Sequence, residues 1–502
     1  MTKILPFITA LAACTFLLSG CKDSNSSRSS SAASPEQNVP LCDGDAITPE
    51  RLFLQQLGSD RVIIKWRGNR DDDTQEATSV CIGTNPNGLP ATSETAAVVT
   101  ETGHSEAVIT GLVPDTTYYY SVGGTGVADP KHTFRTAPVK GALPADGNIR
   151  VWIVGDAGTA SSPLLDRGDN AGGQAAVRDG YHTWIAANGG EPADLFLMLG
   201  DNAYLDGTDE QHQISVFDMY TDTLASVGLW PTIGNHEMGS FGLSQSPLVE
   251  LYTPVTGVAD LPPDSPVPYF NIHTLPTQGE TGGVPSGTEQ YYSFDYGNVH
   301  VISLDSQVSA RSEANRTAML EWVTADLQSS TADWTIVIFH HPPYTKGSHD
   351  SDVDAGGVDQ PIFDMREQFN PVFEAHGVDL VYGGHSHSYE RSYYLSGHTG
   401  LSDTFDPAIH TELNSAGDPA SGQGAEAYTQ ITKSGADDKV VYTVAGSSGQ
   451  ATGMTDPAGH PAHFFSTGAD LGSVVVDVDT TTLTARFIND KGEVLDHFII
   501  TR

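Results

Sequence analysis

Basic residues are scarce in this sequence: 24 Lys and Arg stand against 63 Asp and Glu among 502 residues, a formal net charge of −39. Nucleic-acid backbones are bound by Lys and Arg that displace counterions from the phosphates, so this balance argues against nucleic acid as a partner. Strong acidity favours solubility in a salty setting outside the cytoplasm.

Long apolar runs are also few. The stretch from Ile4 to Leu18, preceded by Lys3, is shorter than the roughly 20 apolar residues that span a bilayer, and it is typical of a secretion signal. It ends in Leu18-Ser19-Gly20-Cys21, which resembles the lipobox of bacterial lipoproteins. The resemblance implies cleavage after residue 20 and a lipid on Cys21, and so an extracytoplasmic protein held to a bacterial membrane, periplasmic or at the cell surface, through that anchor only. Ordinary signal cleavage beside a chance cysteine is the alternative.

Only four cysteines are present. Cys14 lies in the predicted signal peptide, residues 1–20, and Cys21 begins a serine-rich segment, residues 21–46, that is typical of a flexible tether. Cys42 and Cys81 remain. In an oxidising compartment such an isolated pair is more often a disulfide than two free thiols, so we expect a disulfide at the start of the first domain.

The apolar content is sufficient for folded cores, at 38% hydrophobic and 8% aromatic residues, and the length favours two or three domains. Residues 47–140 show short strands without a helical period, which predicts a small β domain. Its Gly111-to-Tyr120 segment, GLVPDTTYYY, with an early Trp66 and a closing TFRT strand, resembles a fibronectin type III-like sandwich and its tyrosine corner. We expect this domain to be a spacer without activity of its own.

Residues 148–502 alternate between apolar strands and helical stretches, which predicts a layered α/β domain that includes antiparallel strands at its end. Strands are expected at 151–154, 195–199, 230–233, 299–304, 335–339, 378–382 and within 472–500. Helices are expected at 172–188, 210–225, 313–328 and 363–375. Loops at 239–289 and 397–437, rich in Gly, Pro and Asp, are expected to shape specificity over one face.

Polar clusters follow five of these strands. They are Gly155-Asp156-Ala157-Gly158, Gly200 to Tyr204 (GDNAY), Gly234-Asn235-His236-Glu237, Val337 to His341 (VIFHH) and Gly384-His385-Ser386-His387. Ligands of open α/β sheets bind beyond the carboxyl ends of the strands, so the clusters are expected to converge in one crevice. Asp, Asn, His and Tyr without cysteine suit two hard or borderline cations such as iron, zinc or manganese.

The five motifs, in this order, resemble those of the metallophosphoesterase superfamily and specifically of the purple acid phosphatases; Tyr204 is the discriminating residue. The resemblance implies a four-layer αββα sandwich following the N-terminal β-sandwich, and two metal ions. The first ion, implied to be Fe(III), would be held by Asp156, Tyr204 and His387. The second, a divalent Zn, Mn or Fe, would be held by Asn235, His340 and His385, and Asp201 would bridge the two.

The resemblance also implies an acid phosphatase, in which a hydroxide generated at the metals attacks the phosphorus of a phosphate monoester in line. The leaving alkoxide then needs a proton, which a histidine can give. His236 is the candidate donor or phosphate clamp. His349 matches a phosphate-facing histidine of plant members, although Asp350 stands where a further histidine often follows. His341 is either a catalytic group or a hydrogen-bonding partner of the ligands.

Two other functions stay open at this stage. One is a phosphodiesterase on the same metal core, for example acting on cyclic nucleotides, against which Tyr204 counts. The other is a surface binding lipoprotein with a decayed catalytic domain, against which the intact ligand set counts. The oligomeric state and the specific ester are not indicated by the sequence.

Overall fold

The computed structural model describes residues 39–68, 78–100, 103–162, 165, 173–238, 267–311, 313–353, 359–430 and 439–502. The predicted signal peptide, Cys21 and most of the tether lie outside the described residues, as do residues 239–266 and 431–438 of the two long loops. Within the described ranges, no helix combines the length and the apolar character that crossing a membrane requires.

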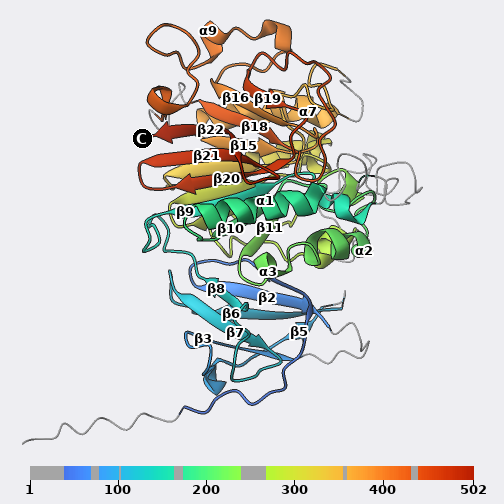
Figure 1. The fold of residues 1–502 in the computed structure, drawn as a ribbon, viewed down its shortest axis with the longest axis vertical. Coiled ribbons are helices and arrows are strands. Elements are labelled where there is room, and N and C mark those ends of the chain that lie inside the picture. The colour runs from blue at the N-terminus through green and yellow to red at the C-terminus, as the bar shows by residue number, and fades with distance from the viewer. Residues whose placement is uncertain are drawn as a thin grey trace, which may run out of the picture. The chain divides into compact units, whose positions relative to one another are not determined.

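The N-terminal part is a β-sandwich of two facing sheets (Figure 1). One sheet has the order β1-β2-β6-β5 and the other β4-β3-β7-β8. The strands are β1 Glu50–Gln55, β2 Arg61–Arg67, β3 Ser79–Gly83, β4 Thr95–Ala96, β5 Val98–Val99, β6 His104–Thr110, β7 Thr117–Val122 and β8 Thr133–Arg135. Trp66, Tyr120 and Phe134 are buried between the sheets. The chain changes sheets between two short strands: β4 pairs with β3, while β5 pairs with β6 of the opposite sheet.

Two local features of this sandwich were expected from its sequence. The Tyr118 hydroxyl accepts a hydrogen bond from the Val113 N–H at 3.0 Å, which is the contact that defines a tyrosine corner. Cys42 and Cys81 form a disulfide that joins the chain ahead of β1 to β3. The wider resemblance to fibronectin type III domains stays a prediction.

The rest of the fold contains two large sheets, one of which continues from the first sheet of the sandwich. An 11-stranded sheet has the order β17-β22-β21-β20-β9-β10-β11-β1-β2-β6-β5, and a 7-stranded sheet has the order β12-β13-β14-β15-β18-β16-β19. In the first, the new strands are β9 Ile149–Val154, β10 Leu195–Met198, β11 Gly228–Pro231, β17 Tyr428–Thr429, β20 Gly472–Val478, β21 Thr482–Asn489 and β22 Val494–Thr501. In the second they are β12 Tyr292–Tyr296, β13 Val299–Ser303, β14 Trp334–Ile338, β15 Leu380–Gly383, β16 Tyr389–Leu395, β18 Val440–Ala445 and β19 His463–Thr467.

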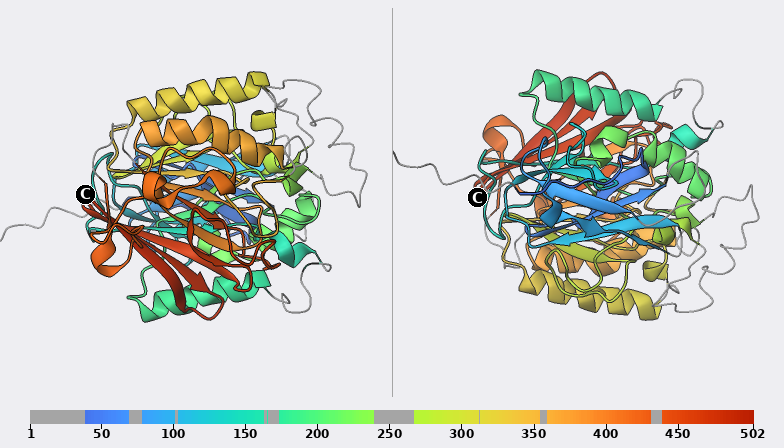
Figure 2. Two further views of the ribbon diagram at one scale, coloured as in Figure 1. Left: turned by 90° about the horizontal axis from the view of Figure 1, so that it is seen from above. Right: turned by 90° about the horizontal axis from the view of Figure 1, so that it is seen from below.

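Helices cover the outer faces of both sheets (Figure 2). Helix α1, Gly173–Ala187, lies on the 11-stranded sheet, while α6, Glu313–Ser329, and α8, Asn370–Ala375, lie on the 7-stranded sheet. Alternate strand residues serve the two sides: Val151 and Ile153 belong to the core between the sheets, whereas Trp152 packs under α1. The predicted layered α/β fold is confirmed, with four layers in the order helix, sheet, sheet, helix.

Two expected helices are interrupted. The stretch at 210–225 consists of α2 Asp209–His212, a π-helical turn at Gln213–Phe217 and α3 Thr221–Leu224. The stretch at 363–375 consists of α7 Gln360–Asp364, a π-helical turn at Met365–Phe369, and α8. A π turn accommodates one extra residue per turn, so the apolar pattern continues past it and the sequence does not reveal the break. Short helices α5, Pro268–Ile272, and α9, Pro407–His410, lie in the connections.

The sandwich shares a sheet with the layered domain. Strand β1 pairs in parallel with β11, with Leu54 opposite Gly228. Next to this pair, the buried guanidinium of Arg51 bonds both carboxylate oxygens of Asp209 and the side chain of Gln213. The segment that carries Tyr204 continues directly into α2, so the sandwich supports one wall of the candidate site.

Candidate metal centre

The five polar motifs meet where the two sheets face each other. Asp156 follows β9, Asp201 and Tyr204 follow β10, and Asn235 follows β11, all in the 11-stranded sheet. In the 7-stranded sheet, His340 follows β14, and His385 and His387 follow β15. Each motif lies at the carboxyl end of its strand, the edge at which α/β sheets bind ligands.

A first group of side chains surrounds the Tyr204 hydroxyl. This hydroxyl lies 3.0 Å from Asp156 Oδ2, 3.2 Å from Asp201 Oδ2 and 3.1 Å from His387 Nε2. Asp156, Asp201 and Tyr204 are almost completely buried. Burial first, and then the charges of Asp156 and Asp201, raise the pKa of Tyr204 well above its ordinary value. A phenolate therefore forms here only beside a cation.

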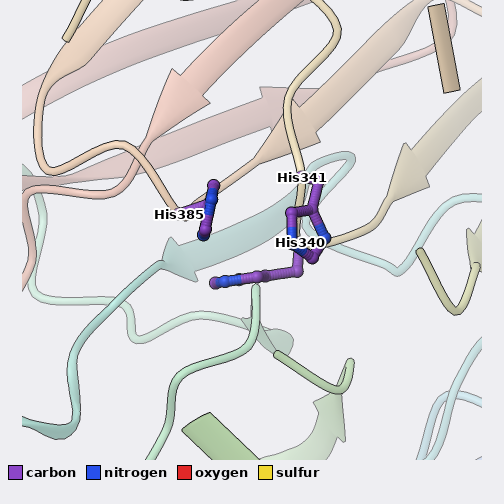
Figure 3. A group of neighbouring side chains, drawn as sticks. All are labelled: His340, His341 and His385. Carbon is purple, nitrogen blue, oxygen red and sulfur yellow. The ribbon is translucent and has the colours of Figure 1, made fainter. Parts of the chain in front are cut away.

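A second group surrounds the Asn235 amide oxygen. Asn235 Oδ1 lies 2.9 Å from His340 Nε2 and 3.0 Å from His385 Nδ1 (Figure 3 shows both rings). Asp201 belongs to both groups, because its Oδ2 is also 3.4 Å from His340 Nε2. The seven predicted ligands thus form two adjoining clusters that share one carboxylate.

The hydrogen bonds behind the second group fix the ring tautomers. His340 Nδ1 is 2.9 Å from the carbonyl oxygen of Leu199, which can only accept, so Nδ1 carries a proton and, in the neutral ring, Nε2 presents a lone pair. His385 Nε2 likewise donates to Asp359 Oδ1 at 3.0 Å, which leaves a lone pair on Nδ1. Two nitrogen lone pairs and the Asn235 oxygen therefore converge. Such a donor set fits a divalent cation.

Other combinations of these side chains also meet the distance requirement of a metal site. In the described part of the chain, three groups bring their ligand atoms within 4.8 Å of one another. They are Asp156 with Asp201 and His340, His340 with His341 and His385, and His349 with Asp359 and His385. Figure 3 shows the second group, in which the three rings lie together beyond the ends of their strands.

The backbone holds several of these residues in an uncommon conformation. Asp156, Asp201 and His385 have φ of 53°, 52° and 65°, and they are three of the six non-glycine residues with positive φ in the described ranges. Such left-handed residues concentrate at functional sites. Neighbouring glycines permit close approach: a Cβ on Gly234 would lie 2.2 Å from Asp201 Oδ1, and one on Gly384 would lie 2.3 Å from Asp156 Oδ1.

His236 and Glu237 have different tasks in the GNHE motif. His236 Nδ1 donates to the Leu205 carbonyl at 2.6 Å, and its Nε2 lies 3.8 Å from Asp201 Oδ2, so the ring faces the shared carboxylate. Glu237 accepts the backbone N–H groups of Asp201, Asn202 and Gly234 at 2.6–2.9 Å. It therefore fixes the loops after β10 and β11.

The two remaining candidate histidines differ in exposure. His341 is fully buried, with Nδ1 2.9 Å from Ser306 Oγ and its ring 4.4 Å from that of His385. His349 has a side chain 30% exposed, donates through Nδ1 to Asp359 Oδ2 at 3.0 Å and stacks on His385. The sequence does not single out Asp359, because this residue precedes a helix instead of following a strand. An aspartate at the start of a helix cannot be told from an ordinary capping residue.

Comparisons with known proteins agree with this site. Residues 149–389 match the calcineurin-like phosphoesterase family, and residues 49–136 match the N-terminal domain of purple acid phosphatases. The chain combines these two domains. It is 26% identical over 382 residues to purple acid phosphatase 18 of Arabidopsis thaliana, covering 74% of this chain and 71% of that protein.

Solved structures share the fold. Purple acid phosphatase PPD1 from seeds of yellow lupin, Lupinus luteus, superposes with a TM-score of 0.63 at 18% identity, covering 91% of this chain and 75% of that one. The structure of PhoD superposes with a TM-score of 0.54 at 14% identity, covering 92% and 90%. The chain is thus similar to purple acid phosphatases in sequence, and it shares the fold of these solved structures.

Proposed function

We propose that the protein hydrolyses phosphate monoesters at a dinuclear metal centre. The observation that carries the proposal is the convergence of two ligand groups on Asp201, whose carboxylate lies within 3.4 Å of both Tyr204 Oη and His340 Nε2. Two ions at such a site acidify a bound water and neutralise phosphate oxygens. The Asp201 carboxylate is within reach of both ligand groups and would hold the two ions close together.

The donor types differ between the two groups. Tyr204 is surrounded by the carboxylates of Asp156 and Asp201, and this anionic set favours a hard trivalent ion, which we propose is Fe(III). His340 and His385 offer neutral nitrogens beside the Asn235 oxygen, which favours a divalent ion such as Zn, Mn or Fe.

The hydrogen bonds of two histidines support a role for them in proton transfer. His236 is held by the Leu205 carbonyl through Nδ1, so its Nε2 is the nitrogen that faces Asp201. His349 is held by Asp359 through Nδ1, and its partly exposed ring leaves Nε2 for an incoming ester or its leaving group. We propose these residues as phosphate clamps and proton donors. His341, buried against Ser306, supports the neighbouring rings.

The test is an assay of purified protein, residues 22–502, after metal loading, with a phosphomonoester and a matched diester as substrates. The proposal expects monoester hydrolysis in the parent and at least a 1,000-fold loss in Asp201→Ala, on the order of what removing a unit of catalytic machinery costs. Asp403→Ala, at an exposed residue, is the matched control and should retain parental activity. Faster hydrolysis of the diester would reject the monoester assignment, and activity in Asp201→Ala would reject the dinuclear centre.

We also propose that a lipid on Cys21 holds the protein outside the cytoplasm, on the strength of the Leu18-to-Cys21 motif. Acyl chains contribute about 0.8 kcal/mol per buried CH2 to membrane attachment. The full chain should fractionate with membranes after expression in a bacterium, and Cys21→Ser should release it. Equal membrane association of the two would contradict the anchor.

A further inference from the structure

Asp359 joins two of the candidate site's histidines through its two carboxylate oxygens. Oδ1 accepts a hydrogen bond from His385 Nε2, and Oδ2 accepts one from His349 Nδ1, each at 3.0 Å. The two rings stack with centroids 3.8 Å apart and an interplanar angle of 28°. The Asp359 side chain is 10% exposed. These three side chains therefore form one connected unit beside the Asn235 oxygen.

The location of Asp359 makes these bonds informative. It occupies the position that caps α7, where an aspartate ordinarily accepts a backbone N–H of the first helical turn. Its side chain makes no such capping bond. Both oxygens instead accept hydrogen bonds from imidazole rings, so Asp359 contacts the candidate site in place of the backbone of α7.

A third metal ion at this group is the less favourable interpretation. His349, Asp359 and His385 lie close enough to hold an ion, but both Asp359 oxygens already accept ring N–H groups. An ion in this place would require the two facing nitrogens to lose their protons. Binding through His385 Nε2 would also occupy the second nitrogen of a ring whose Nδ1 already faces Asn235.

We propose that Asp359 is a positioning residue that acts through both histidines, an inference that rests on the proposed dinuclear centre. By accepting the His385 Nε2 proton, it leaves the Nδ1 lone pair directed at Asn235 Oδ1, 3.0 Å away. Carboxylates behind ligating histidines fix the ring and raise its basicity, and their loss weakens metal binding. By accepting the His349 Nδ1 proton, the same carboxylate aims the other nitrogen of His349 at the substrate side. Retention of the second metal and the orientation of His349 are thereby coupled.

The first variant is Asp359→Asn. The amide replaces one of the two accepting oxygens with an NH2 donor, so it cannot accept at both of the positions that now face the ring N–H groups. The expected result is about 10–100-fold weaker retention of one of the two ions, with the other retained, measured by chelator competition and metal analysis on the holoenzyme. The second variant, Asp359→Ser, keeps a side chain that can cap α7, so it preserves the helix start while removing the carboxylate. It should show the same selective loss.

Asp352→Asn is the matched control. Asp352 lies in the same part of the chain, but its carboxylate contacts Lys346 and Ser402 and no ring. It should retain both ions like the parent. A second readout uses a His349→Ala background. There, Asp359→Asn should still weaken metal retention in the chelator competition. Its effect on kcat/KM at saturating metal should be smaller than in the parent, because the contribution that Asp359 makes through His349 is already absent.

The inference is overturned if both Asp359 variants retain the two ions within twofold of the parent. It is equally overturned if Asp352→Asn loses metal to the same extent, since the effect would then be a general disturbance of the segment. If the parent binds two ions and hydrolyses monoesters, and Asp359→Asn behaves in the same way, only this inference is refuted. A parent that binds no metal would refute the proposed function as well.

Discussion

Three candidate ligands hold their side chains in place through a strained backbone. Asp156, Asp201 and His385 have positive φ, which costs about 1–3 kcal/mol per residue and is tolerated where the surroundings determine it. At Asp156, the Oδ1 atom accepts the His385 backbone N–H at 2.6 Å, so one ligand fixes the backbone of another. Protein contacts thus preorganise these residues for a metal.

Gly234 provides a test of this preorganisation. A Cβ there would lie 2.2 Å from Asp201 Oδ1 and 2.3 Å from the Asp201 backbone nitrogen, which is too close for any relaxed structure. Gly234→Ala should displace Asp201 and lower metal affinity at least tenfold. Gly58→Ala, where the new Cβ would meet Thr281 at an ordinary 3.4 Å, is the control. Metal titrations that do not distinguish the two variants would contradict the close approach.

Most residues of the candidate site could be predicted from the sequence. The seven predicted ligands each follow an apolar strand, usually beside glycine, and a strand end is a signal that one sequence can carry. Asp359 lacks such a signal, because its partners His349 and His385 are 10 and 26 residues away and their meeting depends on tertiary structure. The contacts of Glu237 carry no such signal either, because its three N–H donors come from two loops.

The helices between the strands are less regular than the apolar patterns of their sequences predict. Helix α2 begins with Thr208, whose side chain forms a reciprocal capping box with Gln211, and the π turn follows after four residues. His212, the last residue of α2, is buried, and its Nδ1 lies 3.1 Å from the Thr208 carbonyl oxygen. Apolar periodicity located the helices, but it could not show these interruptions, since packing against β1 and α5 decides them.

His212 makes stability depend on pH. Burial lowers the pKa of His212 to about 4, whereas an unfolded chain titrates near 6.5. As the pH falls from 6.5 towards 4, the unfolded state takes up a proton that the folded state excludes, so stability is lost by up to about 1.4 kcal/mol per pH unit. Above pH 6.5 this contribution is fully present.

The prediction is measured with His212→Gln, which keeps a polar side chain of similar length but does not titrate. The free energy of unfolding is measured by denaturant titrations at pH 7, 6 and 5. It should fall less steeply with pH in the variant than in the parent, and the difference in slope should correspond to the uptake of up to one proton. Parallel pH profiles for the two proteins would contradict it.

The whole molecule is organised around one sheet that spans both domains. The parallel pairing of β1 with β11 places Leu54 opposite Gly228, 174 positions later, and the buried Arg51 side chain adds an ion pair to the half-exposed Asp209. The sequence indicated a sandwich followed by a layered domain, and each has its predicted class of fold. It could not indicate that they share a sheet, because no local pattern specifies a strand pairing across that separation.

Because the two domains share a sheet, we expect the layered domain to need the sandwich in order to remain soluble. Deleting residues 1–140 would turn β11, a fully buried strand, into an open sheet edge, and such edges promote aggregation. The fragment should elute as soluble aggregate, or fail to remain soluble, in size-exclusion chromatography with light scattering. Deleting residues 1–38 leaves β1 and Cys42 intact and is the control, expected to be monodisperse. A stable, monodisperse 141–502 fragment would contradict the prediction.

The most direct test of the dinuclear centre is anomalous X-ray diffraction from crystals of the metal-loaded protein. We expect two anomalous peaks about 3.5–4 Å apart, as in two-metal hydrolytic sites. One peak should lie among Asp156, Tyr204 and His387, and the other among Asn235, His340 and His385. Asp201 should lie between the peaks. A single peak, or two peaks away from these side chains, would contradict the account.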